Sequence, residues 1–70
     1  MKLNKEDERV VAIRKNSEGE NFFLLEEIDY TERLLRNTIK QYEEKYPTWS
    51  RNNPVVRFAM CSILVKEIEE

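Results

Sequence analysis

The chain has 70 residues, a single cysteine, no histidine, and a formal net charge of −2 from 12 basic and 14 acidic side chains. A chain of this length forms one small domain, whose core alone contributes roughly a few kcal/mol, so a disulfide, a metal or an oligomer contact often adds stability. One cysteine excludes an internal disulfide, and without histidine the usual zinc sites lack ligands. We therefore expect an oligomer, with no metal and no cofactor.

The charge balance and the first residues also exclude some ligands and locations. A net charge this small gives no general attraction to nucleic acid or anionic lipid, so any DNA contact has to be local. The start, residues 1–9, has no apolar signal core, and no apolar run approaches the ~20 residues of a membrane span. We expect a cytoplasmic protein that does not enter a membrane.

The first part of the chain is predicted to be a loose arm followed by a β-hairpin at 9–27. Residues 1–8 are polar and form the arm. Residues 10–13 are rich in β-branched side chains, which favours a strand. Residues 16–19 are predicted to form the turn. Asn and Ser side chains hydrogen-bond to nearby backbone, and Gly19, the only glycine, readily adopts a positive φ.

The second strand of this hairpin is predicted at 21–27. Its register places Lys15 opposite Glu20, Ile13 opposite Phe22, Val11 opposite Leu24 and Arg9 opposite Glu26. Opposite charges then close both ends of the ladder, which favours this register over its neighbours.

A competing interpretation makes 22–46 one long helix, because apolar side chains recur there at helical intervals. The stripe breaks at Thr31 and Glu32, and just upstream Asp29 begins a capping box with Glu32 three residues later. We therefore predict helix one at 30–46, ended by Pro47, and leave open whether 22–28 is strand or helix.

The run 53–68 is predicted to be helix two. Asn53 is a good N-cap, Pro54 suits the first helical position, and the residues that follow are apolar on every side. A helix that is apolar all round must be covered all round, which this short chain cannot do alone. We therefore predict an α+β fold, a small β-hairpin followed by two helices, dimeric through the C-terminal helix. The predicted dimer interface consists of Val56, Phe58, Met60, Ile63, Leu64 and Ile68.

Catalytic chemistry has little support in this sequence. Cys61 has aliphatic neighbours and no histidine to activate it, which indicates a structural thiol. The glutamates at 43–44 and 67–70 are typical of a solvated helix face rather than an acid–base pair. We predict that the protein is not an enzyme.

The loop between the two predicted helices is the candidate binding surface. Tryptophan and arginine are frequent interface anchors, so we predict a partner-binding site there. Its residues are Tyr46, Trp49, Arg51 and Asn52. The same loop precedes a predicted helix N-terminus, where free amides and the helix dipole favour an anion such as phosphate.

The order of strand, helix, short loop and second helix resembles the ribbon-helix-helix family of dimeric DNA-binding regulators. The resemblance is carried by Ser50-Arg51-Asn52 followed by residues 55–60. It implies that the second helix lies in a dimer core and that a strand ribbon enters the DNA major groove. By position, the phosphate site would be Ser50, Arg51, Asn52 and Asn53, and the more basic candidate for the ribbon carries Arg9, Arg14 and Lys15.

A second resemblance is to the small dimeric Z-ring-associated adaptors of bacterial cell division. It is carried by the predicted hairpin, by residues 35–47 and by Ala59-Met60. From the residues and these resemblances together, we expect a small non-catalytic regulatory module that acts through protein–protein contacts as a homodimer. The alternative is a DNA-binding transcriptional regulator of ribbon-helix-helix type.

Overall fold

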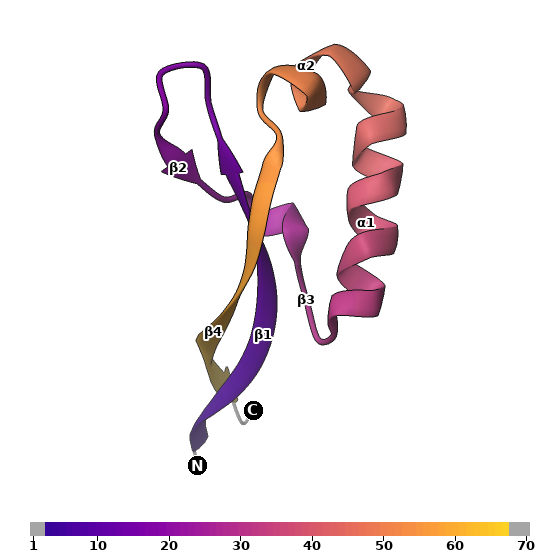
Figure 1. The fold of residues 1–70 in the computed structure, drawn as a ribbon. Coiled ribbons are helices and arrows are strands. Elements are labelled where there is room, and N and C mark those ends of the chain that lie inside the picture. The colour runs from indigo at the N-terminus through magenta and orange to yellow at the C-terminus, as the bar shows by residue number, and fades with distance from the viewer. Residues whose placement is uncertain (1–2, 68–70) are drawn as a thin grey trace.

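The computed structural model describes the backbone of residues 3–67 and the side chains of residues 8–62 (Figure 1). The elements are β1 (Leu3–Lys15), β2 (Asn21–Phe22), the 3₁₀ turn η1 (Leu25–Glu27), β3 (Ile28–Asp29), α1 (Glu32–Lys45), α2 (Pro47–Asn52) and β4 (Val55–Glu67). The fold class is α+β, with an antiparallel sheet and two helices, and the described chain ends in a strand.

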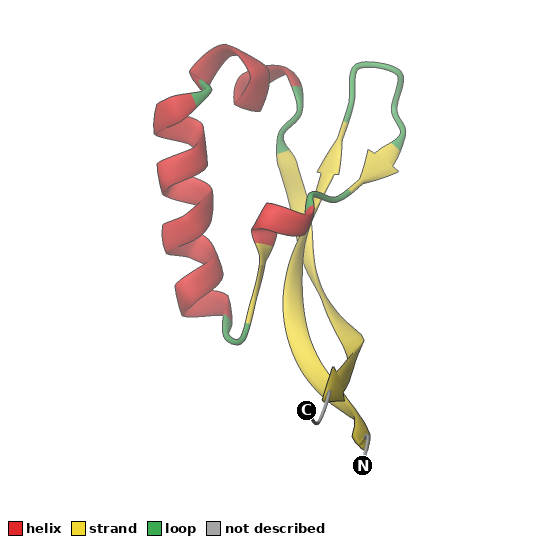
Figure 2. Ribbon diagram, turned by 180° about the vertical axis from the view of Figure 1, so that it is seen from behind, coloured by secondary structure: helices red, strands yellow, loops and turns green. Residues whose placement is uncertain are grey.

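Strand β1 is the centre of the sheet. β4 pairs antiparallel with it from Leu3↔Glu67 to Arg14↔Val55, and Figure 2 shows the two strands running together toward both ends of the chain. The other edge of β1 holds β2 and β3, which pair with separate short stretches of it. Among the described residues, the part of the sheet at residues 3–9 of β1 is therefore a two-stranded ribbon of β1 and β4.

The core lies between α1 and one face of the sheet. Val10 and Ala12 of β1 meet Leu35 and Ile39 of α1, and Phe58 of β4 packs against the same cluster. These helix positions are one turn apart, so they lie on one side of α1 and leave the charged side in solvent. Helix one was thus predicted correctly in type, and its observed limits are Glu32–Lys45 rather than 30–46.

The cap of α1 differs from the predicted one. Thr31, not Asp29, is the N-cap, and its Oγ1 accepts a hydrogen bond from the Leu34 amide at 3.2 Å. Asp29 belongs to β3, and its carboxylate accepts from the Thr38 hydroxyl at 2.8 Å. Both residues can cap a helix, and pairing with β1 holds Asp29 in the sheet.

The predicted helix two is wrong, because Val55–Glu67 is strand β4. A run in which almost every residue is apolar is compatible with a strand as well as with a helix, because its periodicity favours neither. The predicted loop at 48–52 is also wrong, since Pro47–Asn52 forms helix α2 with Pro47 in its first turn. Dimerisation through a C-terminal helix therefore has no structural basis, and Ile68 lies outside the described residues.

The loose arm predicted at 1–8 is wrong for its described part. Residues from Leu3 onward belong to β1, because β4 supplies backbone partners as far as Glu67. Met1 and Lys2 lie outside the described residues. Charged residues are unfavourable in strands by propensity, and here the long pairing overrides that preference.

The turn of the hairpin is confirmed, and its register is one residue away from the prediction. Gly19 has φ 83°, and Asn16 Oδ1 accepts from the amides of Glu18 and Glu20. The Asn16 amide donates to the Glu20 carbonyl at 2.9 Å, so Asn16 and Glu20 lie opposite each other across the turn, where Lys15 and Glu20 were predicted to do so. Phe22 consequently lies opposite Arg14 instead of Ile13. The second strand, predicted at 21–27, is only Asn21–Phe22, and its predicted last residues form η1 instead.

Candidate protein-binding surface

Among the described residues, the open edge of β4 is the longest strand edge without backbone hydrogen-bond partners from another strand. β4 contains 13 residues, and within residues 3–67 its only partner strand is β1. An edge of this length presents a row of N–H and C=O groups that another strand can pair with. Natural edge strands are usually blunted by charges, proline or bulges, but between Val55 and Val65 the only charged residue is Arg57.

Two backbone hydrogen bonds show which residues of β4 face this edge. The Lys15 amide donates to the Pro54 carbonyl at 3.0 Å, while the Asn16 amide donates to Glu20 on the other side. Successive residues of a strand turn their polar groups to opposite edges, so odd-numbered residues of β1 bond toward β4. The register pairs odd with odd residues from Ile13↔Arg57 downward. The outward-facing backbone groups of β4 therefore belong to residues 58, 60, 62, 64 and 66.

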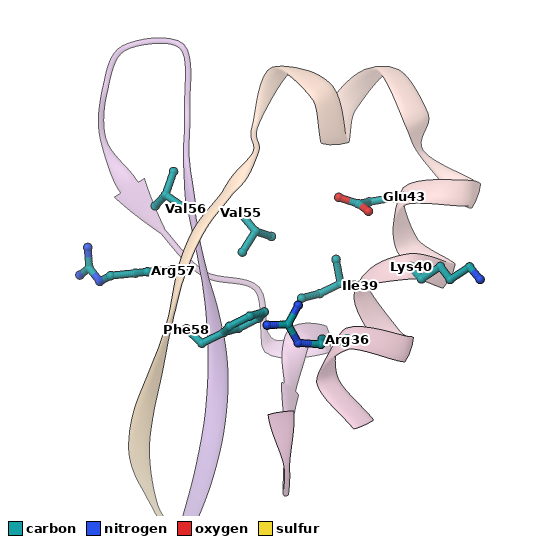
Figure 3. Close-up of a pocket in the computed structure, with 8 residues that line it drawn as sticks. All are labelled: Arg36, Ile39, Lys40, Glu43, Val55, Val56, Arg57 and Phe58. Carbon is teal, nitrogen blue, oxygen red and sulfur yellow. The ribbon is translucent and has the colours of Figure 1, made fainter. Parts of the chain in front are cut away.

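A groove runs beside the upper part of this edge, between α1 and β4 (Figure 3). Ile39, Val55 and Phe58 form its apolar floor, and Figure 3 shows Arg36 and Glu43 pointing into it from the helix. The Arg36 guanidinium lies 4.8 Å from the centre of the Phe58 ring. Lys40 and Arg57 also line the groove, but their side chains point away from its centre in Figure 3. A strand added to β4 would lie along the open side of this groove.

The face of the sheet that α1 does not cover is also apolar. A hollow of about 490 Å³ lies on it between β1, β4 and the segment leading to β3. Its apolar lining includes Val11, Ile13, Phe23, Leu25, Ile28 and Ala59. Phe23 is 53% exposed and Leu25 79% exposed, which is unusual for large apolar side chains that lie together. Cys61, a free and partly buried thiol, lines the same hollow.

The predicted interface residues of β4 lie on this surface in part. Val56 and Met60 are exposed, and Phe58 is half-buried between the core and the groove. Ile63 and Leu64 belong to β4, but their side chains lie outside the described part of the chain. The sequence assigned this segment the wrong secondary structure, and a dimer interface formed by these residues stays a prediction.

The predicted partner-binding residues lie elsewhere, in and around α2. Trp49 is half-buried and meets Tyr42 and Phe22 edge to face, with ring centres 5.5 and 6.1 Å away. The Tyr46 ring is tilted by 50° against the Tyr42 ring, with ring centres 4.8 Å apart, and Tyr46 is 41% exposed. Arg51, like Asn52, is exposed. Partner binding by these residues stays a prediction. Trp49 itself packs against Phe22 and Tyr42 within the domain.

This aromatic group covers a buried ion pair that the sequence did not predict. Arg14 and Glu27 are both 0% exposed. Nε and one terminal nitrogen of Arg14 each donate to Glu27 at 2.7 Å, and the other terminal nitrogen donates to the Asn53 carbonyl at 2.7 Å. The guanidinium lies 5.0 Å from the centre of the Trp49 ring. The Arg14 side chain thereby connects β1 with η1 and with the C-cap of α2.

The predicted anion site does not have the required geometry. Residues 50–52 form the end of α2 and lead into a strand, so no helix begins at Asn53. The end of a helix carries the negative pole of its dipole, which disfavours phosphate. Ser50 is buried, and its Oγ has no hydrogen-bond partner among the described residues.

The basic residues predicted for a DNA-reading ribbon do not form one exposed basic surface. Arg14 is engaged in the buried pair described above, whereas Lys15 is exposed. Arg9 lies over the ring of Tyr30, 3.7 Å from its centre. The second helix that the ribbon-helix-helix arrangement requires is the strand β4.

No helix in the described part of the chain is long and apolar enough to cross a membrane. Among the same residues, no cluster of three or more cysteine, aspartate or glutamate side chains is placed to hold a metal ion. Comparisons of the chain with protein families, curated proteins and solved structures found no match. What this surface does is therefore inferred from its own geometry.

Proposed function

We propose that this protein is a small non-catalytic regulatory module that acts through protein–protein contacts, by pairing the open edge of β4 with a strand of another chain. The supporting observation is the edge itself, a strand of 13 residues with one free side in the described fold. Strand addition obtains affinity from main-chain hydrogen bonds and specificity from side-chain pockets beside the edge. The groove between α1 and β4 is a pocket in that position.

The apolar floor of the groove indicates which strands fit. A strand paired with β4 turns alternate side chains toward α1, where Ile39, Val55 and Phe58 offer apolar contact. Arg36 and Glu43 flank this floor with opposite charges, so a bound strand meets both signs. We expect bound segments to alternate between apolar residues on the groove side and polar residues on the other.

A Ser62→Pro substitution tests this proposal. Residue 62 turns its N–H to the open edge, so proline there removes one donor for an incoming strand and keeps the bonds to β1. In a display selection of random extended peptides at low protein concentration, we expect wild type to enrich apolar–polar alternating sequences that Ser62→Pro no longer binds. The control Ser62→Thr keeps the donor and should bind as wild type does.

Two outcomes would contradict the proposal. Peptides that bind Ser62→Pro as well as wild type would place the binding surface away from the β4 edge. A complex with mixed-sequence duplex DNA at low salt, weakening steeply as salt is added, would favour the DNA-binding alternative, since each neutralised phosphate releases counterions. We expect no such complex.

A further inference from the structure

We infer that the strand which pairs with β4 is β4 of a second copy, antiparallel and centred on Ser62; this inference rests on the proposed function and names its partner. The pairing joins the two sheets into one continuous sheet. Because a twofold axis relates the copies, each contact occurs twice, as in isologous dimers.

The lower half of the fold supports a second copy as the partner. There, residues 3–9 of β1 and 61–67 of β4 pair only with each other among the described residues. An isolated two-stranded ribbon is marginally stable in water, and adding strands stabilises it. Pairing of β4 with β4 of the second copy produces four adjacent strands, in the order β1, β4, β4 and β1. It also covers the open edge of β4 in each of the two copies.

The composition of the two ribbon strands identifies β4 as the inner one. Residues 4–9 of β1 are polar or charged throughout, as suits an outer strand. In β4, residues 58–61 and 63–65 are apolar, which is typical of a strand with neighbours on both sides. Val56 is 46% exposed and Met60 65% exposed in the single chain. Pairing along β4 would reduce the exposure of these side chains.

Charge complementarity selects the register. Hydrogen bonding along the edge requires outward-facing residues to lie opposite one another, so only even-numbered shifts are possible. With Ser62 opposite its own copy, Arg57 lies opposite Glu67 of the second copy, and this attraction occurs twice. A shift that centres the pairing on Cys61 instead puts Arg57 opposite Val65 and leaves Glu67 opposite Val55. Charge complementarity therefore favours the Ser62-centred register over the Cys61-centred one.

The same register closes the groove. Met60 then lies opposite residue 64 of the second copy, and Phe58 opposite residue 66. The incoming strand consequently runs along the open side of the groove lined by Ile39, Val55 and Phe58 (Figure 3). The open edge and the groove beside it become parts of one interface.

The native cysteine provides a reporter for this register. Cys61 faces β1 with its backbone groups, so across the new interface it forms a non-hydrogen-bonded pair with residue 63 of the second copy. Side chains are closest in such pairs, and their Cα separation lies within the disulfide range. An Ile63→Cys variant should therefore form two intermolecular disulfides with Cys61, and for each of them one oxidised glutathione accepts two electrons and two protons and becomes two reduced glutathiones.

The expected result is a covalent dimer of Ile63→Cys on a non-reducing gel, formed roughly tenfold or more faster than with wild type, because pairing raises the effective concentration of the thiols. Val65→Cys is the matched control, since residue 65 lies opposite Ala59 in this register and finds no thiol. Equal cross-linking of the two variants would overturn the register.

Unmodified protein gives a second readout. Sedimentation should show a wild-type dimer with a melting temperature that rises with protein concentration. Arg57→Glu should weaken the dimer, and Arg57→Glu combined with Glu67→Arg should restore it. A wild-type monomer at all concentrations would overturn the second copy as partner, and strand peptides that still bind it would leave the proposed function standing. Loss of both kinds of binding would overturn both.

Discussion

Replacing Glu27 with leucine is expected to unfold the domain at room temperature, with a loss of about 3–5 kcal/mol in the free energy of unfolding. Arg14 is 0% exposed and donates two hydrogen bonds of 2.7 Å to the Glu27 carboxylate. Without that carboxylate the guanidinium remains charged in a site closed to water. A loss of this size exceeds or equals what a core of this length supplies, roughly a few kcal/mol. Circular dichroism of the variant at room temperature checks whether it is unfolded, and urea titration of wild type gives the stability that the loss has to exceed.

Two further variants separate the unpaired charge from simple loss of contacts. The double variant Arg14→Met with Glu27→Leu removes both charges and should recover most of the lost stability, because apolar replacements of a buried pair are often neutral. Glu32 and Arg36 form an exposed ion pair at 3.1 Å, so Glu32→Ala should cost less than about 1 kcal/mol. A Glu27→Leu protein as stable as Glu32→Ala would contradict the prediction.

The parts of the fold that sequence reasoning predicted well depend on local chemistry. The turn at 16–19 follows from Asn16 and Gly19, whose backbone roles are set within the turn itself. Helix α1 follows from an apolar stripe that includes Leu35 and Ile39, because helical spacing places both on one side. In these segments the residues that decide the structure are close neighbours in the chain.

Strand β4 was missed because periodicity does not separate a strand from a helix where almost every residue is apolar. Asn53 and Pro54 read as a helix start, although Pro54 in fact only precedes the strand and accepts a bond from Lys15. The β-branched Val55 and Val56 pointed toward a strand. What decides the structure is pairing with β1, at the opposite end of the sequence, which no local pattern contains.

The ion pair and the role of Trp49 were missed for the same reason. Arg14 and Glu27 are 13 residues apart, and their contact depends on η1 folding back over β1. Phe22 reaches Trp49 only because the hairpin register places it opposite Arg14. A tryptophan in a predicted loop therefore looked like a surface anchor.

Replacing Trp49 with alanine is expected to lower the free energy of unfolding by about 2–4 kcal/mol, somewhat less than a fully buried tryptophan because its side chain is half-buried. The loss has two sources. The edge-to-face contacts with Tyr42 and Phe22 disappear, and the Arg14 guanidinium, 5.0 Å from the ring centre, loses the indole that covers it. The size of the loss is read from urea titration and thermal melts.

Arg51→Ala is the matched control for this prediction, because Arg51 lies in the same helix and is exposed. Its effect should stay within about 0.5 kcal/mol, as surface substitutions usually do. Trp49→Phe should retain part of the stability, since a smaller ring still covers Arg14. The prediction is contradicted if Trp49→Ala lowers the free energy of unfolding by less than about 1 kcal/mol while partner binding falls. Trp49 would then be a surface anchor, and the aromatic group would not hold the ion pair in place.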